Sequence, residues 1–185
     1  MITYICILRG INVSGHRMIK MEALRQLFAG LGFFNVQTYI QSGNVIFQSK
    51  DANRHKLETL ISNAILKKYN FDIPVLIKEL EELRQIILSN PFINDKKKDI
   101  AHLHVTYLSG NPVLSHFKEI KEGQYKPDEF QIIGNNIYLY CPNGYGISKL
   151  TNSFWESKLK VTATTRNWKT ANELIRIAEN ISQTW

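Results

Sequence analysis

Two stretches of this chain carry residue types that bind anions, and they lie near opposite ends of the sequence. The first follows an apolar N-terminal segment and reads RGINVSGHRMIK, with Arg9, Asn12 and Gly15. An arginine can grip a carboxylate or phosphate through two parallel hydrogen bonds, and an asparagine side chain both donates and accepts. Glycines allow backbone amides to face an anion. The stretch therefore predicts a loop that contacts a phosphate or a carboxylate.

The second stretch, SKLTNSFWESKLKVTATTRNWKTANE, has cations where two helices are predicted to begin. Lys149 precedes one predicted helix, and Arg166 and Lys169 lie at the start of the other. A helix N-terminus already carries partial positive charge, so an exposed cation there costs roughly 0.3–1 kcal/mol. Positions 146 to 170 hold five basic residues and one acidic residue. This charge pattern predicts a surface that binds an anion.

Each of these residues also has a structural explanation. Arg9 can tie its loop to a carbonyl oxygen, and Asn12 can cap a turn. Thr165 or Asn167 can cap the last helix and have no other role. The cost of a cation at a helix start is small enough for chance to tolerate. Residue types alone leave both explanations open.

A third motif, QSGN, joins two predicted strands. Gly43 is explained by the turn itself. If this turn meets the Arg9 loop in the fold, Ser42 and Asn44 can orient a bound ligand through their polar side chains. Both residues are therefore part of the predicted site.

Other sequence patterns exclude several kinds of site. The N-terminal loop has the glycine spacing of a P-loop, but His16 and Arg17 stand where GxxxxGK[ST] needs Lys and a Mg²⁺-binding hydroxyl, which excludes a nucleoside triphosphatase. His102 and His104 alternate with apolar residues and lack a third ligand, so they predict a polar sheet face and no metal site. No triad, nucleophile elbow or carboxylate pair is identifiable. The sequence therefore names no general base, no cofactor and no reaction, and leaves open whether the protein is an enzyme.

The order of predicted elements indicates an α+β fold of two related halves. Residues 1–78 follow the order β-α-β-β-α-β, which is the ferredoxin-like motif, and a helical linker follows over 79–100. Residues 101–185 form a related β-α-β-β-α half with a helix over Ser115–Glu122. Two helices close the chain, and the second of them replaces the sixth strand of the motif.

Composition narrows the class of protein. With 185 residues, 44% of them hydrophobic, the chain can bury a core without a metal or a disulfide. Its formal charge of +7 suits phosphate-bearing partners. Two cysteines without ligand spacing, no signal peptide and no apolar stretch long enough for a bilayer predict a cytoplasmic protein without a membrane partner.

The segments LRGINVSGHRMIKMEALR, TYIQSGNVIF and SKLTNSFWESKLKVTATTRNWKTANEL resemble the DUF1697 family, a set of bacterial proteins of unknown function. The likeness spans nearly the whole chain. The family's loop usually reads RGINVGG, so Ser14 stands here in place of a glycine. The resemblance implies an α+β fold with ferredoxin-like parts, and it implies no activity, substrate or catalytic residue.

Our leading hypothesis is that a small phosphorylated or carboxylated ligand, such as a nucleotide, binds in a cleft between the RGIN loop and the C-terminal basic helices. Arg9, Lys149 and Arg166 would hold its charge. The other residues of the predicted site would orient it or present backbone amides: Asn12, Gly15, Ser42, Asn44, Thr165 and Asn167.

Two alternatives remain open. One is a module that binds nucleic acid non-specifically through the basic C-terminal stretch. Specific binding of the RRM kind is disfavoured, because SGNVIFQS lacks the aromatic pattern on which RRM proteins stack bases. The other is an interaction protein without a ligand site. The oligomeric state is not predicted.

Overall fold

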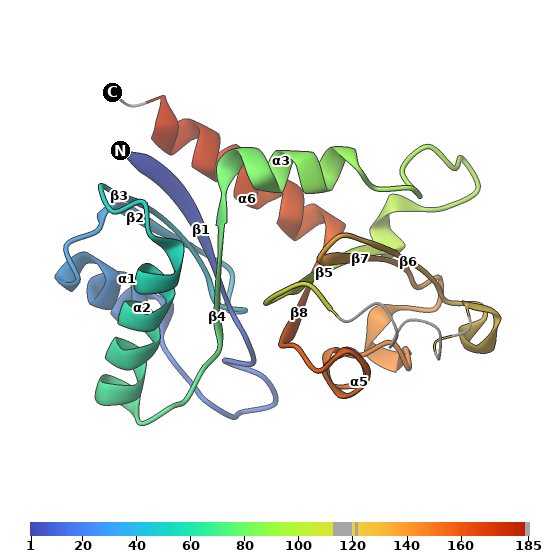
Figure 1. Cartoon of the computed structure of the whole chain (residues 1–185), viewed down its shortest axis with the longest axis horizontal. Coiled ribbons are helices and arrows are strands. Elements are labelled where there is room, and N and C mark those ends of the chain that lie inside the picture. The colour runs from blue at the N-terminus through green and yellow to red at the C-terminus, as the bar shows by residue number, and fades with distance from the viewer. Residues whose placement is uncertain (113–119, 121, 184–185) are drawn as a thin grey trace. The chain divides into compact units, whose positions relative to one another are not determined.

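The computed structural model describes residues 1–112, 120 and 122–183. Contacts divide the chain into two compact units. The first runs from Met1 to Gln85 and includes the segment from Glu173 onward, and the second runs from Ile86 to Asn172. Each unit holds a four-stranded sheet in which all neighbouring strands are antiparallel (Figure 1). The prediction of an α+β fold is confirmed.

The first unit follows the element order predicted for it, β-α-β-β-α-β. Its elements are β1 Ile2–Leu8, α1 Met21–Gly30, β2 Phe34–Tyr39, β3 Asn44–Ser49, α2 Arg54–Tyr69 and β4 Val75–Glu79. The strands lie in the order β2-β3-β1-β4. Each helix therefore connects two strands that are separated by a third strand in the sheet.

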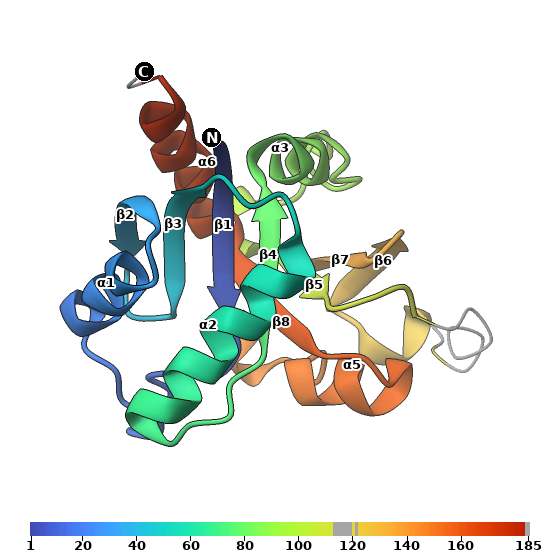
Figure 2. The ribbon, with the colours of Figure 1, turned by 60° about the vertical axis from the view of Figure 1, so that its left-hand side comes forward.

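Both helices of the first unit cover the same face of its sheet (Figure 2). Alternate residues of β1 point to that face, because side chains alternate along a strand. They join helix residues in one apolar cluster: Tyr4, Cys6, Leu8, Leu24, Phe28, Val45, Phe47, Leu57, Ile61, Ile65 and Ile77. The C-terminal helix α6, Trp168–Ser182, is tied to β1 by a hydrogen bond between the hydroxyls of Thr3 and Ser182, 2.8 Å apart.

The second unit has its own sheet, in the strand order β6-β7-β5-β8. Helix α3, Leu80–Leu88, leads into it along the chain, and its elements are β5 Leu103–Leu108, β6 Glu129–Ile133, β7 Asn136–Tyr140, α5 Asn152–Leu159 and β8 Ala163–Asn167. Its core gathers Leu108, Phe130, Ile137, Leu139, Trp155, Leu159 and Ala163. The helix predicted over Ser115–Glu122 falls mainly outside the described residues.

The predicted βαββα order of the second half is wrong in one respect. The sixth strand of the motif was expected to be absent, but the structure has a strand, β8, immediately before α6. β8 pairs with β5, from His104 opposite Asn167 to Leu108 opposite Ala163. The segment VTATT is rich in β-branched residues, which favour strands because their side chains pack well on a pleated surface. β8 therefore completes the second sheet before α6 begins.

This strand changes the position of the C-terminal cations. Arg166 lies in β8 and not in the first turn of a helix. Lys149 precedes Thr151, whose hydroxyl caps α5 by accepting a hydrogen bond from the N–H of Phe154. Of the three cations expected at helix starts, only Lys169 lies in a first turn. The unfavourable interaction with the helix dipole is thus limited to one exposed lysine.

Candidate functional site

The RGIN loop of the first unit is a short hairpin that follows β1. The N–H of His16 donates to the carbonyl oxygen of Val13 at 2.9 Å. Between them, Ser14 and Gly15 have φ angles of 50° and 77°. Two successive positive φ angles are the signature of a type I′ turn, whose twist suits a two-residue hairpin connection. The loop therefore reverses the chain and returns it toward the end of β1.

Asn12 fixes this hairpin with its side chain. The amide nitrogen donates to the carbonyl oxygens of Ile19, at 3.0 Å, and Gln41, at 2.8 Å. The amide oxygen accepts from the N–H of Ile19 at 2.7 Å. The φ angle of Asn12 is 53°, a left-handed conformation that asparagine adopts more readily than most residues. These bonds show that Asn12 stabilises the turn, which is the structural explanation given for this residue in the sequence analysis.

The bond to Gln41 brings the RGIN loop and the QSGN turn together, which was the condition for including the turn in the site. The N–H of Leu8 also donates to the carbonyl oxygen of Gly43 at 2.8 Å. Ile11 packs directly on Gly43, where an added β-carbon would lie 2.8 Å from Ile11 Cδ1. Only glycine fits at this position of the turn.

Asn44 and Ser42 stabilise the turn from within. Asn44 is fully buried, and its side-chain nitrogen donates to the Ser42 hydroxyl at 2.9 Å and to the Tyr39 carbonyl oxygen at 3.1 Å. An unpaired buried amide would cost about 1–3 kcal/mol, so these bonds account for asparagine at this position. Their first role is to shape the turn.

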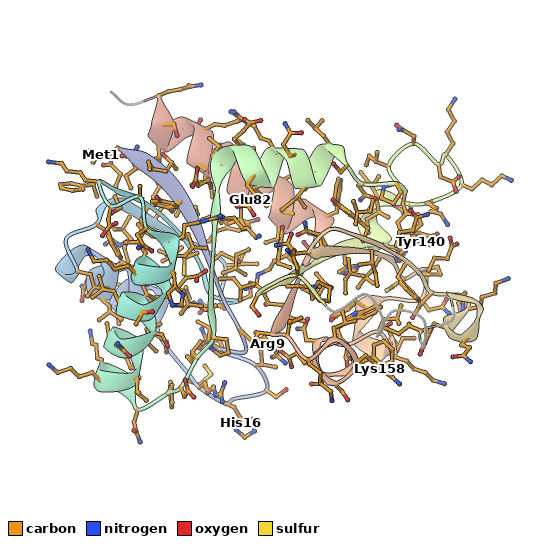
Figure 3. The ribbon with its side chains drawn as sticks, viewed as in Figure 1. Met1, Arg9, His16, Glu82, Tyr140 and Lys158 are labelled. Atoms are coloured by element: carbon orange, nitrogen blue, oxygen red, sulfur yellow. The ribbon has the colours of Figure 1, made fainter. Side chains whose placement is uncertain are left out.

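Two arginines lie at this end of β1. Arg9 is half-buried, and its N–H donates to the carbonyl oxygen of Pro74 at 3.0 Å. The exposed Arg17 folds back onto Gly10, where an added β-carbon would lie 3.8 Å from a terminal guanidinium nitrogen of Arg17. Figure 3 labels Arg9 and His16 at the same end of the unit. Arg17 forms no ion pair with any residue of the described chain.

The charge of this segment is entirely positive. Residues 1–21 contain no Asp or Glu, and their basic residues are Arg9, His16, Arg17 and Lys20. The first acid, Glu22, bonds to the Arg25 guanidinium, which lowers the pKa of the Glu22 carboxyl.

Arg17 was missed as a candidate in the sequence analysis, where it was used only to exclude a P-loop. The dipeptide Ser14-Gly15 was the available signal, because such pairs mark turns that reverse the chain.

The remaining predicted residues lie in the second unit, on two faces of β8. Side chains alternate along a strand, so Thr165 and Asn167 share one face while Arg166 lies on the other. Asn167 caps α6, since its side-chain oxygen accepts a hydrogen bond from the N–H of Thr170 at 2.8 Å. The expectation of a cap at this position is confirmed.

Thr165 is the centre of a hydrogen-bond network. Its hydroxyl donates to the side-chain oxygen of Asn152 at 2.7 Å. Its oxygen therefore accepts the bonds from Tyr145, at 3.0 Å, and Thr106, at 2.7 Å. One donor and two acceptor sites are then in use, so the Thr165 hydroxyl has no capacity left for a ligand. Thr165 joins β8 to β5 and α5.

His104 lies beside this network, on the face of β5 that carries Thr106, so the face is polar as predicted but buried here. His104 is 9% exposed and stacks on Tyr145 with ring centroids 5.0 Å apart. Its Nδ1 lies 3.1 Å from the carbonyl oxygen of His102, which only accepts, so in the neutral ring Nδ1 carries the proton. Burial lowers the pKa of His104 below its ordinary value of 6.5, so the ring is neutral at pH 7.

Arg166, on the opposite face, is buried with 7% exposure. Its guanidinium donates to the Thr164 hydroxyl at 3.0 Å and to the Thr165 carbonyl oxygen at 2.9 Å. Nearby Tyr107 has a buried hydroxyl without a hydrogen-bond partner among the described residues. Burial raises the pKa of Tyr107, and the positive charge of Arg166 opposes this rise.

Lys149 is exposed between two buried neighbours, Ser148 and Leu150. The N–H of Leu150 donates to the Ser148 hydroxyl at 3.0 Å, which fixes the backbone on both sides of the lysine. The predicted site residues thus form two groups. The first unit holds Arg9, Asn12, Gly15, Ser42 and Asn44, and the second holds Lys149, Thr165, Arg166 and Asn167.

Metal and thiol chemistry find no support in the residues described. Among them, no three His, Cys, Asp or Glu side chains are placed to hold a metal ion. Burial raises the pKa of the Cys141 thiol to about 11, so this thiol stays protonated at pH 7.

None of the helices in residues 1–112 and 122–183 combines the length and hydropathy that crossing a bilayer requires.

Comparison with protein families identifies the chain. The model of a family described as "Protein of unknown function (DUF1697)" matches residues 1–138. The chain belongs to the DUF1697 family. The match includes the RGIN loop and the QSGN turn and ends before Lys149, so only the first group of predicted residues lies within it. No protein of curated function matches this DUF1697 chain.

A solved structure with a similar fold is that of the conserved bacterial protein SP0830 from Streptococcus pneumoniae. The two proteins are 22% identical, with a TM-score of 0.72, over 96% of this chain and 98% of the other. At this level of identity the likeness shows a shared fold.

Proposed function

We propose that this DUF1697 protein binds a small anionic ligand, phosphorylated or carboxylated, and that the RGIN loop contacts its charge. The observation that carries the proposal is the position of Arg17, whose guanidinium folds back against Gly10, the residue after Arg9. Both arginines belong to a 21-residue segment without an acid. The planar guanidinium fork matches the oxygens of a phosphate or carboxylate.

The rigidity of the loop supports the same proposal. Asn12 bonds to Ile19 and Gln41, and Ile11 packs on Gly43, so the loop is held by contacts within the protein. A loop that is already ordered loses little conformational entropy when a ligand binds. In this proposal Asn12, Ser42 and Asn44 position the loop, and the arginines contact the ligand.

Within the second unit, Lys149 and Arg166 remain the candidate anion contacts. Lys149 is exposed, whereas Arg166 is buried and already donates to Thr164. Thr165 and Asn167 bond within the protein and would act as positioning residues. In this proposal, Lys149→Ala weakens any anion binding by the second unit.

Thermal unfolding with inorganic phosphate, citrate and ribose 5-phosphate tests the proposal. A ligand that binds only the folded state at 100 times its Kd stabilises it by about 2.7 kcal/mol. Arg17→Ala should reduce this stabilisation, and Lys67→Ala, at an exposed position of α2, should leave it unchanged. The absence of stabilisation by any of these anions, or equal stabilisation of the Arg17→Ala protein, would contradict the proposal.

A non-specific nucleic-acid-binding module is the alternative, and an interaction domain without a ligand site is the third choice. Nucleic-acid affinity should fall steeply with salt concentration because bound cations are released from the phosphate backbone. The exposed large apolar residues of the RGIN loop are Val13 and Met18, which offer no aromatic surface for base stacking along a strand. This favours a small ligand.

We also infer that both units are ferredoxin-like and that the protein is cytoplasmic. The first unit's βαββαβ order supports the fold assignment. The second unit's sheet arranges its strands in a corresponding order. The cytoplasmic assignment is supported by Cys6 and Cys141, which form no disulfide, as is usual in a reducing compartment.

A further inference from the structure

Three aliphatic side chains are exposed in the segments that carry the loop arginines and the adjoining turn. Val13 is 57% exposed, Met18 61% and Ile40 48%. Val13 and Met18 belong to the hairpin, and Ile40 precedes Gln41, whose carbonyl oxygen accepts the bond from Asn12. A single exposed aliphatic residue needs no explanation, whereas three of them in segments joined by the Asn12–Gln41 bond are available to contact one ligand.

Ile40 is exposed and also has an unfavourable backbone conformation. Its φ angle is 48°, in the left-handed region, where a β-branched residue is an outlier because its Cβ crowds the following carbonyl oxygen. Glycine or asparagine would adopt this conformation at lower cost. An isoleucine that is half-exposed in such a conformation adds little to the core, so its side chain is suited to a contact outside the chain.

The hairpin buries the aliphatic residues at its two ends and leaves Val13 and Met18 between them exposed. Ile11 and Ile19, at its two ends, are 1% and 2% exposed and belong to the core of the first unit. Between these anchors, the bonds of Asn12 and the turn from Val13 to His16 hold the chain away from the core. Val13 and Met18 therefore stay at the surface as fixed parts of the loop.

We infer that the ligand of the RGIN loop is a phosphate ester that carries an apolar group, of the class of nucleoside monophosphates. Arg9 and Arg17 contact its phosphate, and Met18, Val13 and Ile40 pack against its base. This inference rests on the proposed function and adds the chemistry of the ligand. Charge complementarity accounts for the phosphate, and the exposed aliphatic surface accounts for the apolar group.

Three probes separate the two contributions: adenosine 5′-monophosphate (AMP), ribose 5-phosphate and adenosine. Isothermal titration of the full chain should give AMP an affinity about fivefold to tenfold higher than that of ribose 5-phosphate, because only AMP carries the apolar base. Adenosine should bind more weakly than AMP by about tenfold or more, since it lacks the charge-assisted hydrogen bonds.

Met18→Ser tests the apolar contact directly. It should lower the affinity for AMP about fivefold and leave that for ribose 5-phosphate unchanged. Leu66→Ser is the matched control, because Leu66 is an aliphatic residue of α2 with 43% exposure, and it should change neither affinity. Ile40→Asn should also weaken AMP binding, although it relieves the backbone strain and so keeps the fold intact.

Other results of these titrations would contradict either the inferred ligand class or the proposed function. Equal affinities for AMP and ribose 5-phosphate would overturn the inference and leave the proposed function standing. Failure of both phosphates to bind, together with inorganic phosphate and citrate, would overturn the proposed function itself. If a single-stranded oligonucleotide binds far more tightly than AMP, with a steep salt dependence, the ligand is a nucleic acid and the inferred class is wrong.

Discussion

Ile11 lies directly on Gly43, so a β-carbon at Gly43 would come within 2.8 Å of Cδ1 of Ile11. This contact joins the RGIN loop to the turn between β2 and β3. The φ angle of Gly43 is 78°, which also disfavours any other residue. We predict that Gly43→Ala lowers the free energy of unfolding by about 2–5 kcal/mol, because backbone strain and overpacking add. Urea denaturation would measure the loss.

Gly15→Ala is the control for this prediction. Gly15 has nearly the same φ angle, 77°, but an added β-carbon there would meet nothing within 4 Å. Its substitution should cost only the backbone term, about 1–2 kcal/mol. If the two variants lose the same stability, the contact between Ile11 and Gly43 contributes nothing.

Ser14 is the position where this chain departs from the usual glycine of its family's loop. Its φ angle of 50° places it in the left-handed region as the first central residue of the type I′ turn. We predict that Ser14→Gly raises the free energy of unfolding by about 0.5–1 kcal/mol, because relief of strain exceeds the entropy added to the unfolded chain. Ala29→Gly, in α1, should instead lower it by about the same amount. A loss of stability in both variants would mean that Ser14 is not strained.

Local sequence signals predicted most of the fold and missed one strand, β8. Helical stripes, apolar strands and glycine turns are local signals, and they predicted the element order of the first unit. β8 was missed because its Thr-rich segment also reads as the capping residues of α6, and Asn167 does cap that helix. Whether such a segment forms a strand depends on its partner β5, which is distant in the sequence.

The candidate site was predicted in part for the same reason. Residue types indicated Arg9, Asn12 and the QSGN turn, but only the fold shows that Asn12 bonds to Gln41. Arg17 was missed because its side chain comes back to Gly10 only when the type I′ turn forms. Contacts that depend on a returning chain are not visible in a linear pattern.

The network around Thr165 predicts a specific loss of stability. Thr165→Val would remove the hydrogen bonds that the Thr165 hydroxyl makes with the Tyr145 hydroxyl and the Asn152 side-chain oxygen. Because the desolvation cost of these polar groups is then no longer offset by the lost bonds, we expect a loss of about 2–3 kcal/mol in the free energy of unfolding. Thr165→Ser keeps the hydroxyl and should cost less than about 1.5 kcal/mol. Equal stability of the two variants in chemical denaturation would show that the network does not stabilise the fold.

The burial of His104 predicts a pH dependence of stability. Its folded pKa lies below the unfolded value of 6.5, so the unfolded chain binds a proton at higher pH than the folded chain does. Stability should therefore fall as the pH drops from about 7 through 6.5 toward the folded pKa, with no contribution above this window. His104→Gln should remove this part of the dependence. An NMR titration that gives His104 a pKa at or above 6.5 would contradict the prediction.

The most direct test of the proposed function is an NMR titration of the ¹⁵N-labelled chain with AMP. If the RGIN loop contacts the phosphate, the amide resonances of Gly10 to Met18 and of Gln41 to Gly43 should shift with one common Kd. In Arg17→Ala, the same resonances should shift only at concentrations about tenfold higher. Shifts confined to residues outside the loop and the turn, or no shifts with AMP, inorganic phosphate and citrate at millimolar concentrations, would contradict the proposal that this loop binds an anion.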